Sequence, residues 1–202
     1  MRITGGIHRS RALRAPRGNV TRPTSDRVRE ALFGILGSLD VLNGARVLDL
    51  YAGSGALALE ALSRGAAHAV LVESSREALL ALRANVVALN LEEHASIIAG
   101  DASVLGRRIA EQGPFDLVLA DPPWALVEQG VALRALSRVL DAGALHPAGR
   151  VVLEHSARTG PPDLPGLFRT ETRRYGDTAL TFYKPAILGA PRTEPAAGSP
   201  FD

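Results

Sequence analysis

Hydrophobic residues in the middle of this chain form short runs that alternate with longer amphipathic stretches. The runs have the length and apolar composition of buried strands, and they cover residues 46–51, 68–73, 95–99, 115–120 and 150–154. Helical patterns lie between them, and they cover residues 56–64, a segment from Ser74 or Ser75 to about Asn90, a segment after Asp101, and residues 128–140. Buried strands that alternate with helices predict an α/β fold, with a mostly parallel sheet and helices on both of its faces.

The two ends of the chain follow different patterns. Two further strand-like runs, 168–175 and 178–184, are joined only by Gly176-Asp177 and predict a C-terminal antiparallel hairpin. Residues 1–23 alternate weakly and predict a small β-hairpin arm outside the main sheet, followed by a helix that Thr24 or Ser25 caps and that runs to Leu36. We therefore expect a basic arm at 1–23, one domain at 24–184 and a disordered tail at 185–202, which is rich in Pro, Ala and Gly.

Composition excludes several classes of protein. The sequence has no cysteine, which rules out disulfides and thiolate chemistry and is compatible with the reducing cytoplasm where we expect the protein. No apolar run approaches the roughly 20 residues needed to cross a bilayer, so we expect no membrane partner. The five histidines do not have the spacing of metal ligands, and we expect no metal.

Positive charge is concentrated at the N-terminus. Residues 1–30 hold eight arginines and two acidic residues, a local charge of +6, so the other 172 residues carry −4 of the net +2. A basic segment of this kind is typical of nucleic-acid contacts, because it neutralises phosphates. The candidate RNA-binding residues are Arg9, Arg11, Arg14, Arg22, Thr24 and Arg27.

A glycine-rich turn follows the first strand. Gly53-Ser54-Gly55 separates that strand from the next helix, and Glu73 ends the second strand 20 residues after Gly53, where a carboxylate can accept ribose hydroxyls. These features alone also fit a dinucleotide-binding enzyme. Asp49 favours S-adenosylmethionine instead, because a carboxylate before the turn would repel a pyrophosphate but hold an ammonium group. Asp101, after the third strand, is placed to accept from an adenine amino group, although it is also a candidate helix cap.

The tetrapeptide Asp121-Pro122-Pro123-Trp124 follows the fourth strand. Two prolines stiffen this loop and remove two backbone donors, which leaves mainly acceptors. The Asp121 carboxylate and the Pro122 carbonyl are suited to accept the two hydrogens of an amino group and so direct its lone pair at a sulfonium methyl. Trp124 offers a flat face on which a base can stack. The loop therefore predicts methyl transfer to an exocyclic amino nitrogen.

Three segments of the chain resemble the RsmD family, bacterial 16S ribosomal RNA guanine-N2 methyltransferases. These segments are residues 22–33, residues 49–66 and the tetrapeptide at 121–124, and the resemblance extends from Arg2 to about Lys184. It implies a class I (Rossmann-like) methyltransferase fold with a seven-stranded sheet, an N-terminal extension that engages RNA, and a guanine acceptor in the 30S subunit or an assembly intermediate. It implies acceptor recognition by Asp121, Pro122 and Trp124, and it places the residues from Arg22 to Arg29 near the cofactor mouth, within reach of RNA. The implied cofactor-binding residues are Asp49, Tyr51, Ala52, Gly53, Ser54, Gly55, Glu73, Asp101 and Ala102.

Residue chemistry alone leaves other functions open. Adenine N6 in nucleic acid and protein glutamine are amino acceptors that fit the same loop. A DNA enzyme needs a sizeable target-recognition region, for which residues 121–150 leave no room, and a glutamine enzyme does not need the basic arm. A non-catalytic RNA-binding assembly factor on the same scaffold is a further alternative, against which the intact loop and glycine turn argue.

Overall fold

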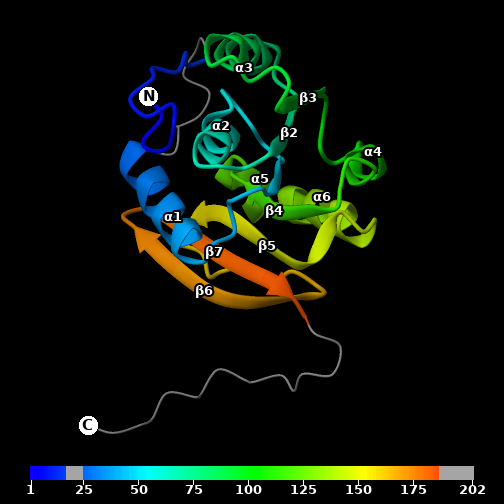
Figure 1. Cartoon of the computed structure of the whole chain (residues 1–202). Helices are drawn as coiled ribbons and strands as arrows, with labels where there is room; N and C mark the ends of the chain where they lie inside the picture. The colour runs from blue at the N-terminus through cyan, green and yellow to red at the C-terminus, as the bar shows by residue number, and fades with distance from the viewer. Residues whose placement is uncertain (17–24, 187–202) are drawn as a thin grey trace, which may run out of the picture.

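A seven-stranded sheet forms the centre of the computed structural model, which describes residues 1–16 and 25–186 (Figure 1). The strands lie in the order β3-β2-β1-β4-β5-β7-β6. β1 to β5 pair in parallel, whereas β7 runs antiparallel to both β5 and β6. This confirms the predicted mostly parallel sheet with a C-terminal hairpin. The strands are β1 (Arg46–Asp49), β2 (His68–Glu73), β3 (Ala95–Ala99), β4 (Phe115–Ala120), β5 (Leu145–Ser156), β6 (Leu167–Tyr175) and β7 (Thr178–Pro185).

Helices cover both faces of the sheet, as predicted. On one face, called here the α2 face, Phe33 of α1, Leu59 of α2 and Leu82 of α3 belong to one buried cluster with Val47 of β1. On the opposite face, called the α6 face, helices α4 and α6 share a second cluster with Leu48. The helices are α1 (Asp26–Ser38), α2 (Ala56–Ser63), α3 (Arg76–Ala88), α4 (Gly106–Ala110), α5 (Trp124–Glu128) and α6 (Val131–Asp141).

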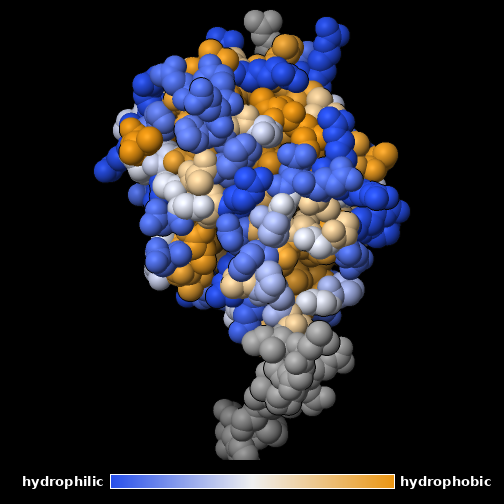
Figure 2. Space-filling model, turned by 45° about the vertical axis from the view of Figure 1, so that its right-hand side comes forward, coloured by the Kyte–Doolittle hydropathy of each residue, from blue (hydrophilic) through white to orange (hydrophobic). Residues whose placement is uncertain are grey.

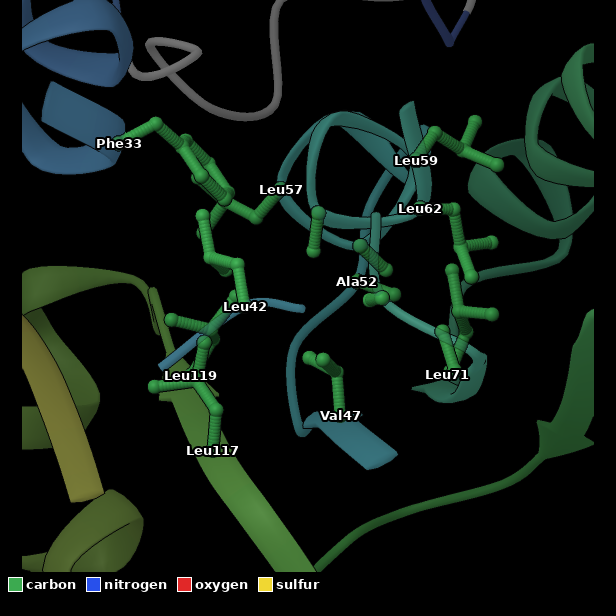
Figure 3. Close-up of a cluster of buried hydrophobic side chains, with 14 of the residues drawn as sticks. Phe33, Leu42, Val47, Ala52, Leu57, Leu59, Leu62, Leu71, Leu117 and Leu119 are labelled. Atoms are coloured by element: carbon green, nitrogen blue, oxygen red, sulfur yellow. The ribbon is translucent and has the colours of Figure 1, made fainter. Parts of the chain in front are cut away.

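Helix α2 lies at the centre of the α2 face. Its sequence is apolar nearly all round, and every residue after Ala56 is buried, as expected for a helix enclosed by other elements. Figure 3 shows its side chains Leu57, Leu59 and Leu62 near those of Val47 and the neighbouring strands. This packing fixes the start of α2, and therefore the glycine turn before it, against the carboxyl ends of the strands.

Two helices differ from their predicted extents. The predicted helix at 128–140 corresponds to α6, which begins only at Val131 because Gly130, with a positive φ of 70°, is its N-cap; a separate short helix, α5, precedes it. α5 begins at Trp124, so the predicted stiff loop is shorter than expected and runs directly into a helix. The helix after Asp101 is only α4, because the Asp101 Oδ1 atom accepts from the Ser103 N–H and makes a turn there; Leu105 is the N-cap of α4.

The N-terminal segment, residues 1–16, packs against the domain. A single antiparallel bridge joins Arg2 to Ala12, where the sequence predicted a small hairpin. Ile3 and Leu13 are buried in the cluster of the α2 face, beside α1 and α2 (Figure 1). Ser25 is the N-cap of α1, and its side chain accepts from the Val28 N–H at 3.2 Å. The other predicted cap, Thr24, and residues 187–202 of the predicted tail lie outside the described residues.

The face of the molecule drawn in Figure 2 is mainly hydrophilic. On the face in Figure 2, hydrophobic residues occur as separate patches between polar ones. Within residues 1–16 and 25–186, no helix combines the length and apolar character needed to cross a bilayer.

Candidate active site

The glycine turn lies at the carboxyl end of β1, as predicted. Gly53 and Gly55 both have positive φ, 56° and 86°, and Gly55 is the N-cap of α2. A Cβ atom at Gly55 would also lie 2.5 Å from a methyl carbon of Leu82. A side chain at this position is therefore strained by the backbone conformation, and it would also require the Leu82 side chain to move.

Asp49 ends β1 directly below this turn, and its side chain is almost completely buried, with 1% of the residue exposed. Its Oδ2 atom accepts from the Ala58 N–H at 3.3 Å, while Oδ1 has no hydrogen-bond partner among the described residues. Burial, and next the charge of Asp121, raise the pKa of Asp49 from 3.8 to about 7, with a smaller contribution from Glu73. An orphaned, buried carboxylate oxygen among other acids fits a cationic ligand group, such as the ammonium of a methionine moiety.

Glu73 lies on the other side of the turn, at the end of β2. Its Oε2 atom accepts from the Gly53 N–H at 2.7 Å, and its Oε1 atom accepts from the N–H groups of Ser74 and Ser75. These bonds hold the carboxylate rigidly beside Gly53. A carboxylate has about four acceptor positions, so this geometry leaves capacity for a ribose hydroxyl.

Tyr51 follows β1 and Asp101 follows β3, and the fold brings the two residues close enough to interact electrostatically. Burial, and next the charge of Asp101, raise the pKa of Tyr51 to about 12. Asp101 itself is exposed, and the following residue, Ala102, is buried. The side chain of Asp101 is therefore at the surface beside the turn, where an adenine amino group can reach it.

The predicted acceptor loop lies beside the turn. β4 pairs with β1 and ends at Ala120, and Asp121 is close enough for its charge to raise the pKa of Asp49. Pro122 is buried, Pro123 is the N-cap of α5, and Trp124 is half-buried as the first residue of that helix. The structure thus brings the predicted cofactor turn and the predicted acceptor loop to one edge of the sheet.

Glu154 is a residue of this edge that the sequence analysis missed. It lies near the end of β5 and is 7% exposed. Ala120 of β4 pairs with Leu153 of β5, so Asp121 and Glu154 are the next residues on two neighbouring strands. A charged residue after the apolar run Val151-Val152-Leu153 was the available signal.

Asn85 was also missed, and it connects the N-terminal segment to the cofactor turn. This α3 residue is 2% exposed. Its Nδ2 donates to the Ser54 and Arg14 carbonyl oxygens, each at 2.9 Å, and its Oδ1 accepts from the Arg14 N–H at 2.7 Å. An asparagine in the interior of an otherwise apolar helix segment was the sequence signal.

The arginines near the N-terminus have different roles. Arg9, Arg11, Arg14 and Arg27 are exposed or partly exposed, and Arg11 also donates to the Ala88 carbonyl oxygen. Arg29, which the resemblance placed among the residues near the cofactor mouth that contact RNA, is fully buried and cannot do so in this structure. Arg22 and Thr24 lie outside the described residues, so their predicted RNA contacts are untested.

A buried charge network explains the position of Arg29. Its Nε lies 3.4 Å from Glu60 of α2, and one terminal nitrogen contacts Asp26. Glu60 also accepts from the N–H and hydroxyl groups of Thr4 and from Arg64. Arg29 is thus a structural cation that joins α1, α2 and the N-terminal segment, because burial of either charge alone would be strongly unfavourable.

No group of three or more histidine, aspartate or glutamate side chains suited to a metal ion occurs in the part of the chain that the structure describes.

The chain is similar to known proteins along nearly its whole length. The family model described as "Conserved hypothetical protein 95" matches residues 1–184. The chain is 36% identical to "Putative rRNA methyltransferase YlbH" of Bacillus subtilis over 187 residues, which cover 91% of this chain and 98% of that protein. It is 37% identical to "Ribosomal RNA small subunit methyltransferase D" of Escherichia coli over 195 residues, which cover 94% and 92% of the two chains.

Solved structures agree with this relationship. A putative methyltransferase of Escherichia coli, YhhF, superposes with a TM-score of 0.79 at 35% identity, covering 92% of this chain and 97% of that chain. A hypothetical protein of Thermus thermophilus gives a TM-score of 0.75 at 36% identity, covering 91% and 99%. The fold is therefore that of class I methyltransferases. Together with the match along residues 1–184, these likenesses establish that the chain belongs to the Conserved hypothetical protein 95 family, which is the RsmD family.

Proposed function

We propose that this protein transfers a methyl group from S-adenosylmethionine to the exocyclic N2 of one guanine in 16S ribosomal RNA, in the 30S subunit or an assembly intermediate. Methyl transfer to ribosomal RNA is the activity after which its relatives are named. The guanine acceptor, its N2 atom and the particle are the finer part of the proposal. The observation that carries it is the meeting of the buried Asp49 carboxylate with the Asp121 loop at one edge of the sheet.

Asp49, Glu73 and Asp101 would hold the cofactor. The Oδ1 atom of Asp49 would accept from the ammonium group, Glu73 from a ribose hydroxyl and Asp101 from the adenine amino group, while the glycine turn lets the backbone approach the ligand. The predicted residues Tyr51, Ala52, Ser54 and Ala102 would line the same site. S-adenosylmethionine, when bound, supplies a methyl group on a positively charged sulfur, which a nitrogen lone pair can attack directly.

Asp121, Pro122 and Trp124 would prepare the acceptor. The Asp121 carboxylate and the Pro122 carbonyl oxygen accept hydrogen bonds from the two amino N–H groups. These bonds direct the nitrogen lone pair toward the methyl group. As positive charge develops on the nitrogen, the nearby carboxylate stabilises it and is placed to receive the departing proton. Trp124, fixed at the start of α5, provides a stacking surface for the base.

The exposed arginines of the N-terminal segment support an RNA acceptor. Asn85 attaches the backbone of Arg14 to the glycine turn, so an RNA phosphate bound by Arg14 would lie near the site. Arg9 and Arg11 extend the same positive segment toward the ends of α2 and α3, where the Ile7 N–H donates to Ser63 and Arg11 donates to Ala88. An adenine N6 or protein glutamine acceptor would fit the loop equally well, but glutamine gives no reason for the arginines. Between Asp121 and Arg150 the chain forms only α5, α6 and the beginning of β5, without an inserted recognition region.

The direct test uses small ribosomal subunits from a strain that lacks this protein. We expect labelled methyl groups to enter 16S ribosomal RNA, and mass mapping to find N2-methylguanosine at one position. Methylation of adenine N6 or of a protein would overturn the proposed acceptor. If the purified protein binds S-adenosylmethionine but no methyl group enters any component of the particle, the enzyme proposal is wrong and an assembly factor is favoured.

A further inference from the structure

Ser54 is the residue of the glycine turn that contacts the N-terminal segment and its anchor on α3. Its carbonyl oxygen accepts from the Asn85 Nδ2 at 2.9 Å, and its hydroxyl donates to the Met1 sulfur at 3.9 Å. On either side of it stand Gly53 and Gly55, both with positive φ. Glycine loses more conformational freedom on ordering than any other residue, so such a turn depends on outside contacts to keep one conformation.

Asn85 joins this turn to the backbone of Arg14. One N–H of its amide donates to the Ser54 carbonyl and the other to the Arg14 carbonyl, while its Oδ1 accepts from the Arg14 N–H. The amide therefore pairs with both backbone groups of Arg14, as a residue of a neighbouring strand would. Asn85 is 2% exposed, and the other buried residues of α3 are all apolar. Displacement of either partner would leave a buried amide group without a hydrogen bond, which is unfavourable.

The residue before Arg14 is connected to the same turn by a second route. The Leu13 N–H donates to the Met1 carbonyl oxygen at 3.0 Å, and Met1 is the residue whose sulfur contacts Ser54. Backbone bonds thus join the beginning and the end of the N-terminal segment. The segment meets the glycine turn at both places, beside α2 and α3 (Figure 1).

The connection from the turn ends at an exposed cation. The backbone of Arg14 is held by Asn85, but its side chain is exposed and is one of the candidate RNA-binding groups. A phosphate bound to this guanidinium would hold Arg14 in place. It would therefore favour the arrangement in which Asn85 reaches Ser54.

Two ligands that favour the same ordered arrangement bind cooperatively. The ligand that binds first bears the entropic cost of ordering, and the second ligand then binds more tightly. Such coupling is reciprocal, so each ligand raises the affinity for the other by the same factor.

On these grounds we propose that Asn85 is a positioning residue that couples RNA binding at Arg14 to the affinity of the glycine turn for the cofactor. The coupling rests on the proposed function and adds its regulation: the turn reaches its full affinity only when RNA is in place. Asn85 itself touches neither the base nor the reacting atoms.

The test measures the dissociation constant of S-adenosylhomocysteine, which has no methyl group to transfer, with and without small ribosomal subunits from a strain that lacks this protein. We expect the subunits to lower this constant at least about fivefold for the wild-type protein. In Asn85→Ala the ratio of the two constants should fall at least about threefold, because any direct contact of acceptor and cofactor remains but the connection through Arg14 is lost. A wild-type ratio of one, or an unchanged ratio in the variant, would overturn the coupling.

Arg14→Ala and Arg9→Ala form a matched pair that leaves Asn85 in place. Both side chains are exposed, but the Arg9 N–H donates to the Gly6 carbonyl and not to Asn85. We expect both variants to bind subunits more weakly, and only Arg14→Ala to lower the ratio at saturating subunits. Equal ratios in the two variants would contradict a route through Arg14. Val139→Ala, in the buried cluster of the α6 face, controls for lost stability and should keep the wild-type ratio.

Hydrogen exchange tests the connection without RNA. S-adenosylhomocysteine alone should slow exchange of the Leu13 and Arg14 N–H groups, which lie outside the proposed cofactor site, and Asn85→Ala should abolish this effect. Exchange that does not respond to the ligand in wild-type protein would overturn the coupling.

Failure of the coupling and failure of the proposed function are distinguishable. If the ratios behave as expected but no N2-methylguanosine forms, the proposed acceptor is wrong and the coupling stands. If N2-methylguanosine forms and Asn85→Ala keeps the wild-type ratio, only the role of Asn85 is overturned.

Discussion

Asp49 is a residue whose burial is unfavourable for folding and whose proposed role is to bind the cofactor. Its carboxyl group is buried, one oxygen has no hydrogen-bond partner among the described residues, and its pKa is raised to about 7. The folded protein therefore binds a proton that the unfolded chain releases above pH 3.8, the ordinary pKa of an aspartate. The contribution of this group to the free energy of unfolding is therefore fully present below pH 3.8, and it is lost as the pH rises toward 7.

Replacement of this residue should therefore stabilise the protein without ligand. We expect Asp49→Asn to raise Tm at pH 8 by about 5 °C, because a buried charge is replaced by a neutral amide of the same shape. Near pH 4 the two proteins should have similar Tm values, since Asp49 is then protonated. Scanning calorimetry at both pH values makes the comparison; an Asn variant less stable than wild type at pH 8 would contradict it.

The same group predicts how cofactor binding depends on pH. A cationic ammonium favours the Asp49 carboxylate, so binding at pH 6 should release a proton. We expect affinity for S-adenosylmethionine to fall by up to about tenfold per pH unit below pH 7. Titration calorimetry in two buffers with different ionisation enthalpies counts the protons. Asp49→Asn should bind weakly and without this pH dependence.

Asp121 should affect the transfer step more than cofactor binding. We expect Asp121→Ala to lower kcat by at least about 100-fold, because the amino group loses the acceptor that orients it. Asp121→Asn keeps one acceptor oxygen and should retain more activity. The dissociation constant for the cofactor, measured separately, should change by less than about threefold; an unchanged kcat would remove Asp121 from the mechanism.

At the scale of elements, alternating apolar runs were enough to predict the sheet, because each central strand is buried on both faces. The positions of Asp49, Glu73 and Asp121 followed from their places at strand ends. Side-chain contacts between elements far apart in the sequence could not be predicted in this way. Arg29 looks like a surface cation in the sequence, and only its approach to Glu60 makes it part of the core.

Asn85 connects α3 to the glycine turn and to the N-terminal segment, and its substitution tests how much these hydrogen bonds contribute to stability and to cofactor binding. Asn85→Ala removes three hydrogen bonds, to Ser54 and to both backbone groups of Arg14. At about 1 kcal/mol each, we expect Tm to fall by about 5 °C or more and KM for the cofactor to rise. Asn85→Asp keeps only the acceptor for the Arg14 N–H. If this variant binds the cofactor as wild type does, the bond to Ser54 is not required for the turn.

At the scale of the whole molecule, charge is divided between the N-terminal segment and the rest of the chain. We expect the double substitution Arg9→Glu and Arg14→Glu to reduce the salt dependence of RNA binding, with a decrease of about 0.7–0.9 in slope for each phosphate that the variant no longer binds. The control is Arg107→Glu with Arg108→Glu, two exposed residues of α4 on the α6 face. A slope that only the control changes would place the RNA on that face.

The anchoring of residues 1–16 also sets an order of events during synthesis. Their partners Glu60, Ser63, Asn85 and Ala88 lie 55 to 77 residues further along the chain. The segment leaves the ribosome before these partners, and until α2 and α3 have been made its contacts are limited to those of Arg2 with Asp26 and Arg29 of α1, since a contact over a long separation must wait for both of its ends. The arginine-bearing surface is thus completed only on a chain whose glycine turn has already been synthesised, so a truncated product would not present the complete surface that we propose binds RNA.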